Sequence, residues 1–299
     1  MVAEVKVDPA LYPFEGNAFD VGGLDLHYLD EGEGDAVVMV HGNPTWSFYY
    51  RELIQELRLD HRVVVPDHIG CGRSDKPGDD RYPYTLARRV EDLTALLDHL
   101  ALRDVTLVVH DWGGMIGMAW AVRHAERVKR LIILNTAAFP KPATKKMPWS
   151  LTLAREWSLG TLLVRGFNAF SRGATRAATT HRLPRRVRDA YCAPYDSWAN
   201  RIATLRFVQD IPLSPADPAW AVVAETEAGL AQFVDTPTLI CWGEQDFVFD
   251  HHFLAVWQQH LPHAEVERYA DAGHYVLEDA RDAILPRVRR FLADHPLER

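Results

Sequence analysis

The sequence LVVHDWGGM, residues 107–115, contains an apolar strand, a tight turn and the small-residue start of a helix. A turn of this kind is strained, lifts one side chain clear of the sheet and points the helix N-terminus at it. The usual pattern is Gly-x-Ser-x-Gly, but here Asp111 replaces the serine, Val109 replaces the first glycine and Gly113 is retained. This context is typical of a nucleophile elbow, so Asp111 is the predicted nucleophile. The alternative is an aspartate that only caps the following helix.

Short β-branched runs alternate with amphipathic helical stretches on both sides of this turn. In residues 85–100, for example, leucine and valine recur on one stripe with charges opposite them, as in a surface helix. The alternation predicts an α/β fold with a mostly parallel sheet and helices on both faces. Residues 19–29 alternate around a glycine pair, which predicts an antiparallel hairpin. The other predicted strands span residues 36–40, 62–65, 105–110, 131–134, 238–242 and 265–269.

The strand pattern stops between residues 136 and 238. We interpret residues 137–232 as a helical cap inserted into an α/β core that comprises residues 1–136 and 233–299. Most aromatic side chains of the cap are expected to pack it on the core, and a few to line an apolar pocket beneath it. These aromatic residues are Trp149, Trp157, Phe167, Phe170, Tyr191, Tyr195, Trp198 and Phe207.

Size and charge restrict the kind of partner. The chain has 299 residues with 47% hydrophobic and 25% charged side chains, which predicts one large domain with an insertion. Its 41 acidic and 33 basic residues give a formal charge of −8 and contain no long single-sign run. This balance gives no footprint for nucleic acid and favours a neutral or anionic small molecule as the partner. The apolar pocket expected beneath the cap makes a hydrophobic small-molecule substrate the expectation.

Cysteine usage and hydropathy indicate a cytoplasmic location. Cys71, Cys192 and Cys241 lie far apart and form neither a CxxC pair nor an even disulfide set, so they are expected to be reduced. Residues 1–10 lack the basic start and apolar stretch of a secretory signal. No window is long and apolar enough for a membrane helix. A peripheral membrane contact stays open, because many enzymes of this kind handle greasy substrates.

A second loop supplies the expected oxyanion hole. The apolar strand 36–40 leads into His41-Gly42-Asn43-Pro44, a pattern that places one backbone N–H beside the nucleophile. The backbone N–H groups of Asn43 and Trp112 are then expected to point at the same spot. A purely structural turn is the alternative.

The general base and its acid partner follow later strands. His274 comes after strand 265–269, which fits the chain order of nucleophile, acid and histidine. Asp246 follows strand 238–242 and is the predicted acid, with Glu244 in the same turn as its competitor. Some enzymes of this fold place the acid at the end of the preceding strand, but Asn135 stands there and cannot carry the charge.

The other histidines are given no chemical role. His110 adjoins the nucleophile, but its side chain should point away from it, and His68 is expected at the surface or in a turn. His251 and His252 are adjacent and are expected to face apart, so no metal site is predicted. Residues 70–74 lack the spacing of a phosphate-binding loop. We therefore expect no cofactor.

An aspartate nucleophile restricts the substrate. Carboxylates are poor acyl-transfer nucleophiles, because attack on an ester gives a labile anhydride, but a desolvated carboxylate displaces a leaving group from sp3 carbon well. Alkyl halides, epoxides and strained lactones are therefore the expected substrate classes.

The motifs HGNPT at residues 41–45 and HDWGG at 110–114, with Asp246 and His274, resemble the haloalkane dehalogenase family of α/β-hydrolases. The resemblance implies that the side chains of Asn43 and Trp112 donate N–H bonds to the leaving halide. Epoxide hydrolases share the elbow but use two cap tyrosines as acids, a part open to Tyr191 and Tyr195.

Five stretches resemble a narrower group, the β-lactone decarboxylases of bacterial olefin biosynthesis (OleB). They are TWSFYYR (45–51), DHIGCG (67–72), APYDSW (193–198), FVQDIPL (207–213) and DFVFD (246–250). The resemblance implies conversion of a cis-3,4-dialkyl-β-lactone into a cis-alkene and CO2, within an assembly that includes other olefin-biosynthesis proteins, a thiolase, a synthetase and a reductase. A haloalkane dehalogenase and an epoxide or ester hydrolase stay as alternatives.

Overall fold

An eight-stranded sheet forms the centre of the computed structural model, which describes residues 5–297. The strand order is β1-β2-β4-β3-β5-β6-β7-β8. Strand β2 runs antiparallel to both of its neighbours, β1 and β4, and every other pair of neighbouring strands is parallel. Every predicted strand is present, and so is the predicted hairpin. The bounds are β1 (Asn17–Asp20), β2 (Asp25–Glu31), β3 (Asp35–Val40), β4 (His61–Pro66), β5 (Val105–Asp111), β6 (Val128–Thr136), β7 (Thr238–Gly243) and β8 (Glu265–Tyr269).

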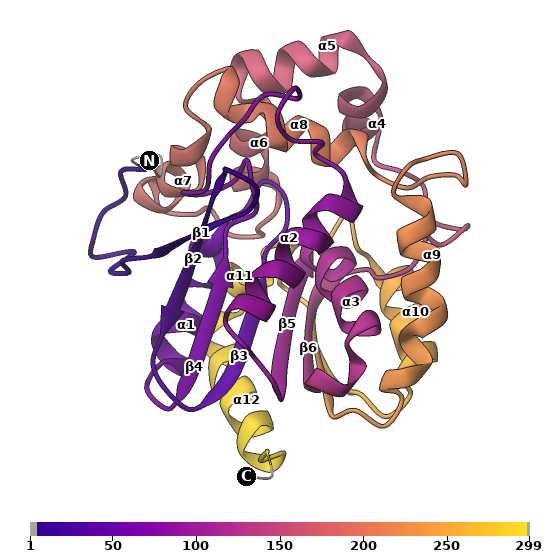
Figure 1. The fold of residues 1–299 in the computed structure, drawn as a ribbon. Helices are drawn as coiled ribbons and strands as arrows, with labels where there is room; N and C mark the ends of the chain where they lie inside the picture. Colours follow the sequence, from indigo (N-terminus) through magenta and orange to yellow (C-terminus); the bar gives the residue numbers. More distant parts are fainter. Residues whose placement is uncertain (1–4, 298–299) are drawn as a thin grey trace.

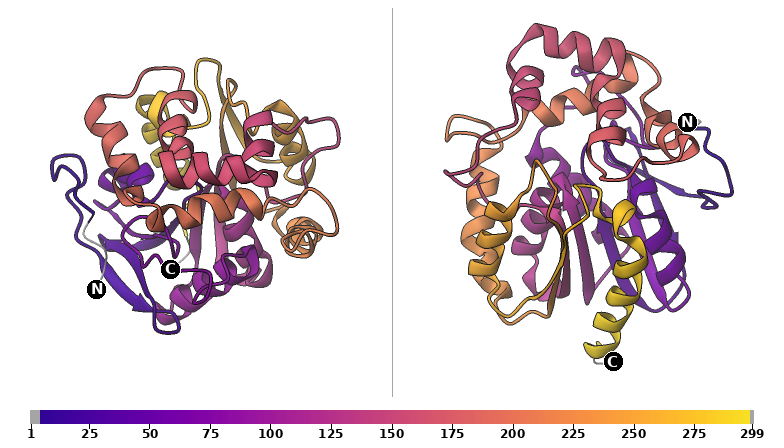
Figure 2. Two further views of the ribbon diagram at one scale, coloured as in Figure 1. Left: turned by 90° about the horizontal axis from the view of Figure 1, so that it is seen from above. Right: turned by 180° about the vertical axis from the view of Figure 1, so that it is seen from behind.

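Helices cover both faces of this sheet, so the predicted α/β architecture is confirmed (Figure 1). One face packs against α2 (Leu86–His99), α3 (Trp112–Arg123), α9 (Trp220–Gly229) and α10 (His251–His260). The other face packs against α1 (Arg51–Leu57), α11 (Val276–Asp279) and α12 (Arg281–Asp294), which Figure 2 shows from behind.

Alternate side chains of strand β5 contribute to the hydrophobic cores on the two faces of the sheet. Leu107 and Val109 of β5 belong to the first core and Val108 to the second, because successive side chains of a strand point to opposite faces. All seven residues of β5 are buried. The strand that carries the predicted nucleophile is therefore enclosed along its whole length.

The remaining helices form a cap over the carboxyl ends of the strands (Figures 1 and 2). The cap contains α4 (Trp149–Glu156), α5 (Ser158–Thr161), the π-helix η3 (Leu162–Gly166), α6 (Ala169–Ala177), α7 (Arg185–Cys192) and α8 (Ile202–Gln209). Short 3-10 turns complete the chain: η1 (Ser47–Tyr50), η2 (Ala125–Arg127), η4 (Ala193–Tyr195), η5 (Ala199–Arg201) and η6 (Leu230–Phe233).

The cap ends earlier than the sequence pattern indicated. The predicted insertion extended to residue 232, but α9 runs beside the sheet and packs on α3 (Figure 1). Val222 and Val223 of α9 belong to the core cluster, and Gly229 approaches Val122 so closely that a Cβ would lie 2.1 Å from its side chain. A helical, apolar sequence alone does not tell which neighbour a helix packs against, and for α9 that neighbour is the core.

Only half of the predicted aromatic packing is present. Tyr191, Tyr195 and Phe207 are buried and Phe170 is partly buried. The other four aromatic residues, Trp149, Trp157, Phe167 and Trp198, are exposed on the cap. Within residues 5–297, no helix combines the length and apolar character needed to cross a membrane. Residues 1–4, part of the segment in which we predicted no secretory signal, lie outside the described residues.

Candidate active site

Asp111 occupies a strained turn between β5 and α3. Its φ of 52° and ψ of −128° lie in a region that residues with a side chain rarely adopt. Two glycines make the turn possible: a Cβ on Gly42 would lie 2.0 Å from the Asp111 carboxylate, and a Cβ on Gly113 would lie 1.9 Å from the Val40 carbonyl oxygen. This is the geometry of a nucleophile elbow, with the carboxylate raised above the sheet.

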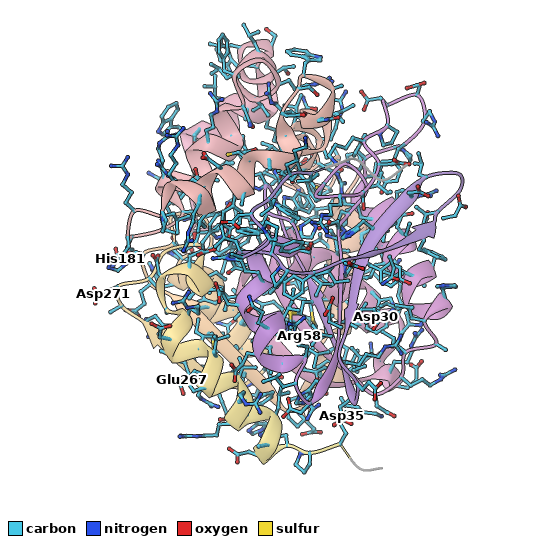
Figure 3. All side chains as sticks on the ribbon, turned by 90° about the vertical axis from the view of Figure 1, so that its left-hand side faces the viewer. Asp30, Asp35, Arg58, His181, Glu267 and Asp271 are labelled. Carbon is cyan, nitrogen blue, oxygen red and sulfur yellow. The ribbon has the colours of Figure 1, made fainter. Side chains whose placement is uncertain are left out.

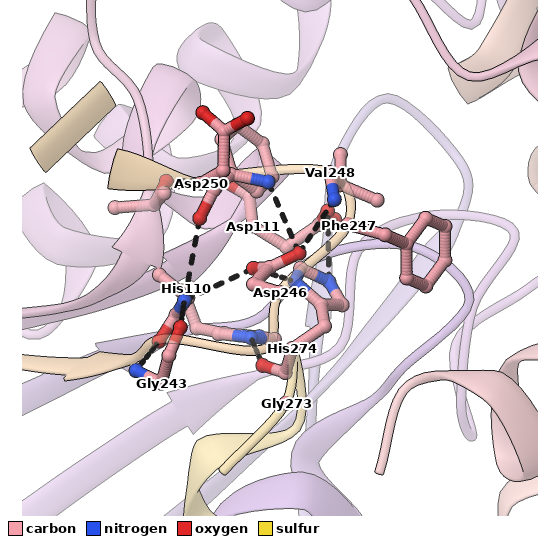
Figure 4. Close-up of polar contacts among 12 residues, drawn as sticks. His110, Asp111, Gly243, Asp246, Phe247, Val248, Asp250, Gly273 and His274 are labelled. Atoms are coloured by element: carbon pink, nitrogen blue, oxygen red, sulfur yellow. Dashed lines mark hydrogen bonds and ion pairs between the residues drawn. The ribbon is translucent and has the colours of Figure 1, made fainter. Parts of the chain in front are cut away.

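His274 lies between two carboxylates (Figure 4). Its Nε2 is 3.3 Å from Asp111 Oδ2, and its Nδ1 is 2.8 Å from Asp246 Oδ2. Asp246 comes from the loop after β7, where its Oδ1 accepts the backbone N–H groups of Val248 and Phe249 at 2.7 and 3.0 Å. The structure thus brings together the predicted nucleophile, base and acid. Glu244, the competing acid, instead pairs with Arg268 at the surface.

The two carboxylates hold the imidazole in its charged form. Burial lowers the pKa of His274, but the Asp246 charge and the hydrogen bonds with Asp111 and Asp246 raise it to about 10. Burial raises the pKa of Asp111, since it disfavours the charged form of a carboxylate as well. The hydrogen bond and the charge of His274, helped by the Asn43 N–H, outweigh burial and bring the pKa of Asp111 below its ordinary value. At neutral pH the site therefore contains an ionised Asp111 beside an imidazolium.

The His41–Pro44 loop contributes to the site through Asn43. The Asn43 backbone N–H donates to Asp111 Oδ1 at 2.6 Å, as expected for an oxyanion-hole donor before substrate enters. Its side-chain Nδ2 donates to the Thr204 carbonyl oxygen at 3.1 Å, which connects the loop to α8 of the cap. An amide NH2 carries two hydrogens, so one remains for a ligand. The Trp112 indole packs on Phe207, with ring centroids 5.3 Å apart.

A cavity of about 310 Å³ lies above these residues. Asn43, Asp111, Trp112 and His274 line its base. Its walls are mostly apolar, as in sites for hydrophobic small molecules, and include Met115, Phe139, Leu151, Phe170, Val208, Ile211, Phe247 and Phe253. The cavity places an ionised carboxylate in a greasy surrounding, which suits displacement at sp3 carbon.

The cap tyrosines do not reach this cavity. Neither Tyr191 nor Tyr195 lines it. The Tyr191 hydroxyl donates to the Glu278 carboxylate, and the Tyr195 hydroxyl donates to the Thr45 carbonyl oxygen at 3.2 Å. The epoxide-hydrolase alternative, which needs two tyrosine acids at the reacting atoms, therefore lacks its donors.

Comparison with known proteins agrees with this geometry. The model of the alpha/beta hydrolase fold family matches residues 35–280. The chain belongs to the α/β-hydrolase family. It is 55% identical over 95% of its length to a cis-3-alkyl-4-alkyloxetan-2-one decarboxylase of Shewanella oneidensis, covering 90% of that protein. It is 51% identical over 96% of its length to a decarboxylase of the same name from Xanthomonas campestris, covering 98% of it.

Solved structures place this α/β-hydrolase in the same fold. The haloalkane dehalogenase DatA of Agrobacterium tumefaciens C58 superposes with a TM-score of 0.87, over 97% of this chain and 100% of that one. The two sequences are 24% identical, so the similarity concerns the fold alone.

Asn135 is a site residue of this α/β-hydrolase that the sequence analysis set aside. Its Nδ2 donates to Asp246 Oδ2 and to the Gly243 carbonyl oxygen, both at 3.0 Å, and its Oδ1 accepts the Gly243 N–H at 2.7 Å. Asn135 therefore positions the acid although it cannot replace it. A polar residue at the carboxyl end of a buried parallel strand was the available signal.

One expectation about the histidines holds in part and another is wrong. His68 begins a turn, because its carbonyl oxygen accepts the Cys71 N–H at 2.8 Å, but it is buried and not at the surface, with its Nε2 3.0 Å from the His41 carbonyl oxygen. His251 and His252 do not face apart, because their ring centroids are 4.1 Å apart. Together with Asp250 they bring possible metal ligands within 4.8 Å of one another, but Lys145 already binds the Asp250 carboxylate at 2.8 Å.

His110 points away from the nucleophile, as expected. Its Nε2 is 2.8 Å from the His274 carbonyl oxygen (Figure 4). Burial, with the nearby His274 charge, lowers the pKa of His110 to about 3, so its ring is neutral and donates this bond. His110 therefore holds the backbone of the catalytic loop and takes no part in proton transfer.

Proposed function

We propose that this α/β-hydrolase is a cis-3-alkyl-4-alkyloxetan-2-one decarboxylase, which converts a cis-dialkyl β-lactone into a cis-alkene and CO2. The two similar decarboxylases support the substrate class, since the likeness extends over nearly the whole of each chain. The observation that carries the proposal is the ionised carboxylate of Asp111 at the base of an apolar cavity. A nucleophile of this kind attacks sp3 carbon and does not suit ordinary ester hydrolysis.

The first step opens the lactone ring. Asp111 attacks C4 from the side opposite the ring oxygen, so a new C4–O bond forms, the C4–O1 bond breaks and the configuration at C4 inverts. The ring oxygen leaves as part of a carboxylate attached to C3. The Asn43 side-chain N–H and the Trp112 indole N–H are the donors proposed to hold that carboxylate, and the His274 cation adds favourable charge.

The second step releases both products. The C3–carboxylate bond breaks to give CO2, its electron pair forms the C3=C4 double bond, and the C4–O bond to Asp111 breaks anti to the departing carboxylate. Inversion followed by anti elimination keeps a cis lactone cis. Asp111 returns as a carboxylate, and no proton or water is consumed. His274 is therefore needed in this reaction as a positive charge and not as a base.

A haloalkane dehalogenase is the second candidate. Asn43 and Trp112 at the base of the cavity favour it, because halide needs the same donors. Purified protein is tested with a cis-dialkyl β-lactone and with 1-bromobutane, and alkene, alcohol and bromide are measured. We expect alkene from the lactone; brisk bromide release without alkene would decide for the dehalogenase.

We further propose that the enzyme works in the cytoplasm, beside other enzymes of olefin biosynthesis. Free cysteines support a reducing compartment, because Cys71 and Cys241 are buried thiols that form no disulfide. Burial raises the pKa of the Cys71 thiol to about 11. Co-purification with the thiolase, synthetase and reductase of the pathway tests the assembly.

A further inference from the structure

Charge is unevenly distributed along the chain. Residues 141–188 contain eleven of the 33 lysine and arginine residues but only one of the 41 acidic residues, Glu156. Since the whole chain carries a formal charge of −8, the rest of it is strongly acidic. Residues 141–188 are therefore basic even though they contain no long uninterrupted run of one sign. Figure 3 shows four of the acidic residues, Asp30, Asp35, Glu267 and Asp271, on the core below the cap.

Most cations of this segment lack an acidic partner. Only three of the eleven lie within 4 Å of a carboxylate: Lys145 beside Asp250, Arg155 beside Asp217 and Glu156, and Arg185 beside Asp189. Among the described residues, the other eight have no carboxylate at that distance. They are Lys141, Lys146, Arg165, Arg172, Arg176, Arg182, Arg186 and Arg188. The outer surface of the cap thus keeps an unneutralised positive charge.

Large apolar side chains are exposed on the same part of the molecule. Six of the nine exposed large hydrophobic residues of residues 5–297 come from the cap, and Trp149 is 78% exposed. The others are Trp157, Leu159, Leu162, Phe167 and Trp198. Cationic and apolar groups are interleaved here, since the Arg165 guanidinium lies 4.7 Å from the centre of the Trp198 ring. The helices that carry most of them, α4 to η3, form the end of the molecule farthest from α12 (Figures 1 and 2).

We propose that this cap surface docks on an anionic lipid bilayer. Unpaired arginines bind lipid phosphates, while exposed Trp, Phe and Leu side chains enter the boundary between headgroups and acyl chains. A nucleic acid or an acidic protein would match the charge, but it would leave six large apolar side chains without an apolar phase. The acidic core is repelled by the same bilayer, so the charge distribution also orients the cap towards the lipid.

The cavity is connected to this surface. Lys146, Ser150, Gly173 and Ala177 are exposed and also line the cavity, and all four belong to the basic segment. A docked cap therefore places a rim of the active-site cavity beside the bilayer. This step rests on the proposed function, because a long-chain dialkyl β-lactone and its alkene product dissolve in lipid far better than in water. The bilayer is then both the source of substrate and the sink for product.

Vesicle co-sedimentation with the full chain tests the docking. Phosphatidylcholine vesicles with and without phosphatidylglycerol are compared at low and high salt. We expect binding to the anionic vesicles that weakens with salt. One double variant, Arg172→Gln with Arg176→Gln, removes two exposed cations that do not line the cavity. At about 1 kcal/mol for each cation near the surface, its binding should be about 30-fold weaker.

Matched controls separate docking from folding and from charge number. Arg103→Gln with Arg290→Gln removes two exposed cations of the core and should leave binding within about twofold of wild type. A second pair compares Trp157→Ser on the cap with Leu59→Ser on the core, both highly exposed in the native chain. Only the cap variant should lose vesicle binding. Circular dichroism confirms that each variant is folded.

Three results would overturn the proposal. They are equal binding to neutral and anionic vesicles, equal loss in cap and core variants, and a cap variant that changes only the oligomeric state in size-exclusion chromatography. The last result would assign the surface to a second copy of the chain. Vesicle binding is measured without substrate, so it stands or fails separately from decarboxylation. If vesicles are bound but lactone is not decarboxylated, the proposed function fails and the docking surface remains.

Discussion

Replacing Asp246 with Asn tests how the site keeps His274 charged. The substitution preserves shape but removes the charge that lies 2.8 Å from His274 Nδ1. Every partner of the Asp246 carboxylate is a donor: His274, Asn135, Val248 and Phe249. An amide has one acceptor and one donor end, so in either orientation its NH2 group faces donors. We therefore expect Asp246→Asn to weaken both the charge and the hydrogen-bond network.

The size of the effect follows from the pKa of His274. Its rise from 6.5 to about 10 corresponds to roughly 5 kcal/mol, shared between Asp246 and Asp111. Losing the Asp246 share, together with mismatched donors around a buried group, should lower the free energy of unfolding by about 3 kcal/mol. For a chain of this size that corresponds to a fall in Tm of about 5 °C.

The pH dependence gives a second signature with a defined sign. Because the folded pKa of His274 lies above its unfolded value, the stabilisation is fully present below pH 6.5 and is lost as the pH rises towards 10. Wild-type Tm should therefore fall across that window, and the fall should be smaller in Asp246→Asn. Thermal melts and imidazole NMR titration measure both effects. Glu244→Gln, at an acid of the same turn paired only at the surface, is the control and should behave as wild type. An unchanged His274 pKa in Asp246→Asn would show that Asp246 does not keep the imidazole charged.

Three further substitutions test the rest of the site. Asp111→Ala should reduce turnover on the order of 10⁴-fold without unfolding the protein, and activity within tenfold of wild type would exclude Asp111 as the nucleophile. Gly42→Ala should abolish turnover, because its Cβ would lie 2.0 Å from the Asp111 carboxylate, and a fully active variant would show that the elbow tolerates a shift there. Asn135→Ala should lower Tm by about 3 °C and reduce turnover less than Asp246→Asn does; equal or larger losses would make Asn135 more than a positioning residue.

Much of the fold and the site follows from short-range patterns in the sequence. Strand β5 could be predicted because an apolar, β-branched run is followed directly by a turn and the glycines of a helix start. The proximity of Asp111, Asp246 and His274 could be predicted because each follows a strand of the parallel sheet, and parallel strands bring their carboxyl ends to one edge. Both predictions depend only on residues that are neighbours in the sequence or on the order of the strands.

The errors concern contacts that only the tertiary structure decides. Helix α9 has an alanine- and valine-rich sequence that would suit either the cap or the core, and packing on α3 assigns it to the core. Asn135 meets Asp246 across 111 residues of sequence, so no local pattern connects them. The exposure of Trp149 on the cap could not be predicted for the same reason. Whether an aromatic residue of a helix is buried depends on which other elements pack against it.

Turnover of a cis-dialkyl β-lactone in ¹⁸O-labelled water tests whether Asp111 attacks C4 and is released without hydrolysis. Attack of Asp111 on C4 and loss of CO2 return the carboxylate with its original oxygens, since no water attacks the aspartyl ester. We predict a cis-alkene as product and an unlabelled Asp111 peptide by mass spectrometry after many turnovers. A dehalogenase-like route hydrolyses the ester at its carboxyl carbon. An alcohol product would show that water hydrolyses an alkyl ester on Asp111. Alkene together with ¹⁸O in the Asp111 carboxylate would show attack on the lactone carbonyl through an anhydride, and either result would contradict attack on C4 followed by release without hydrolysis.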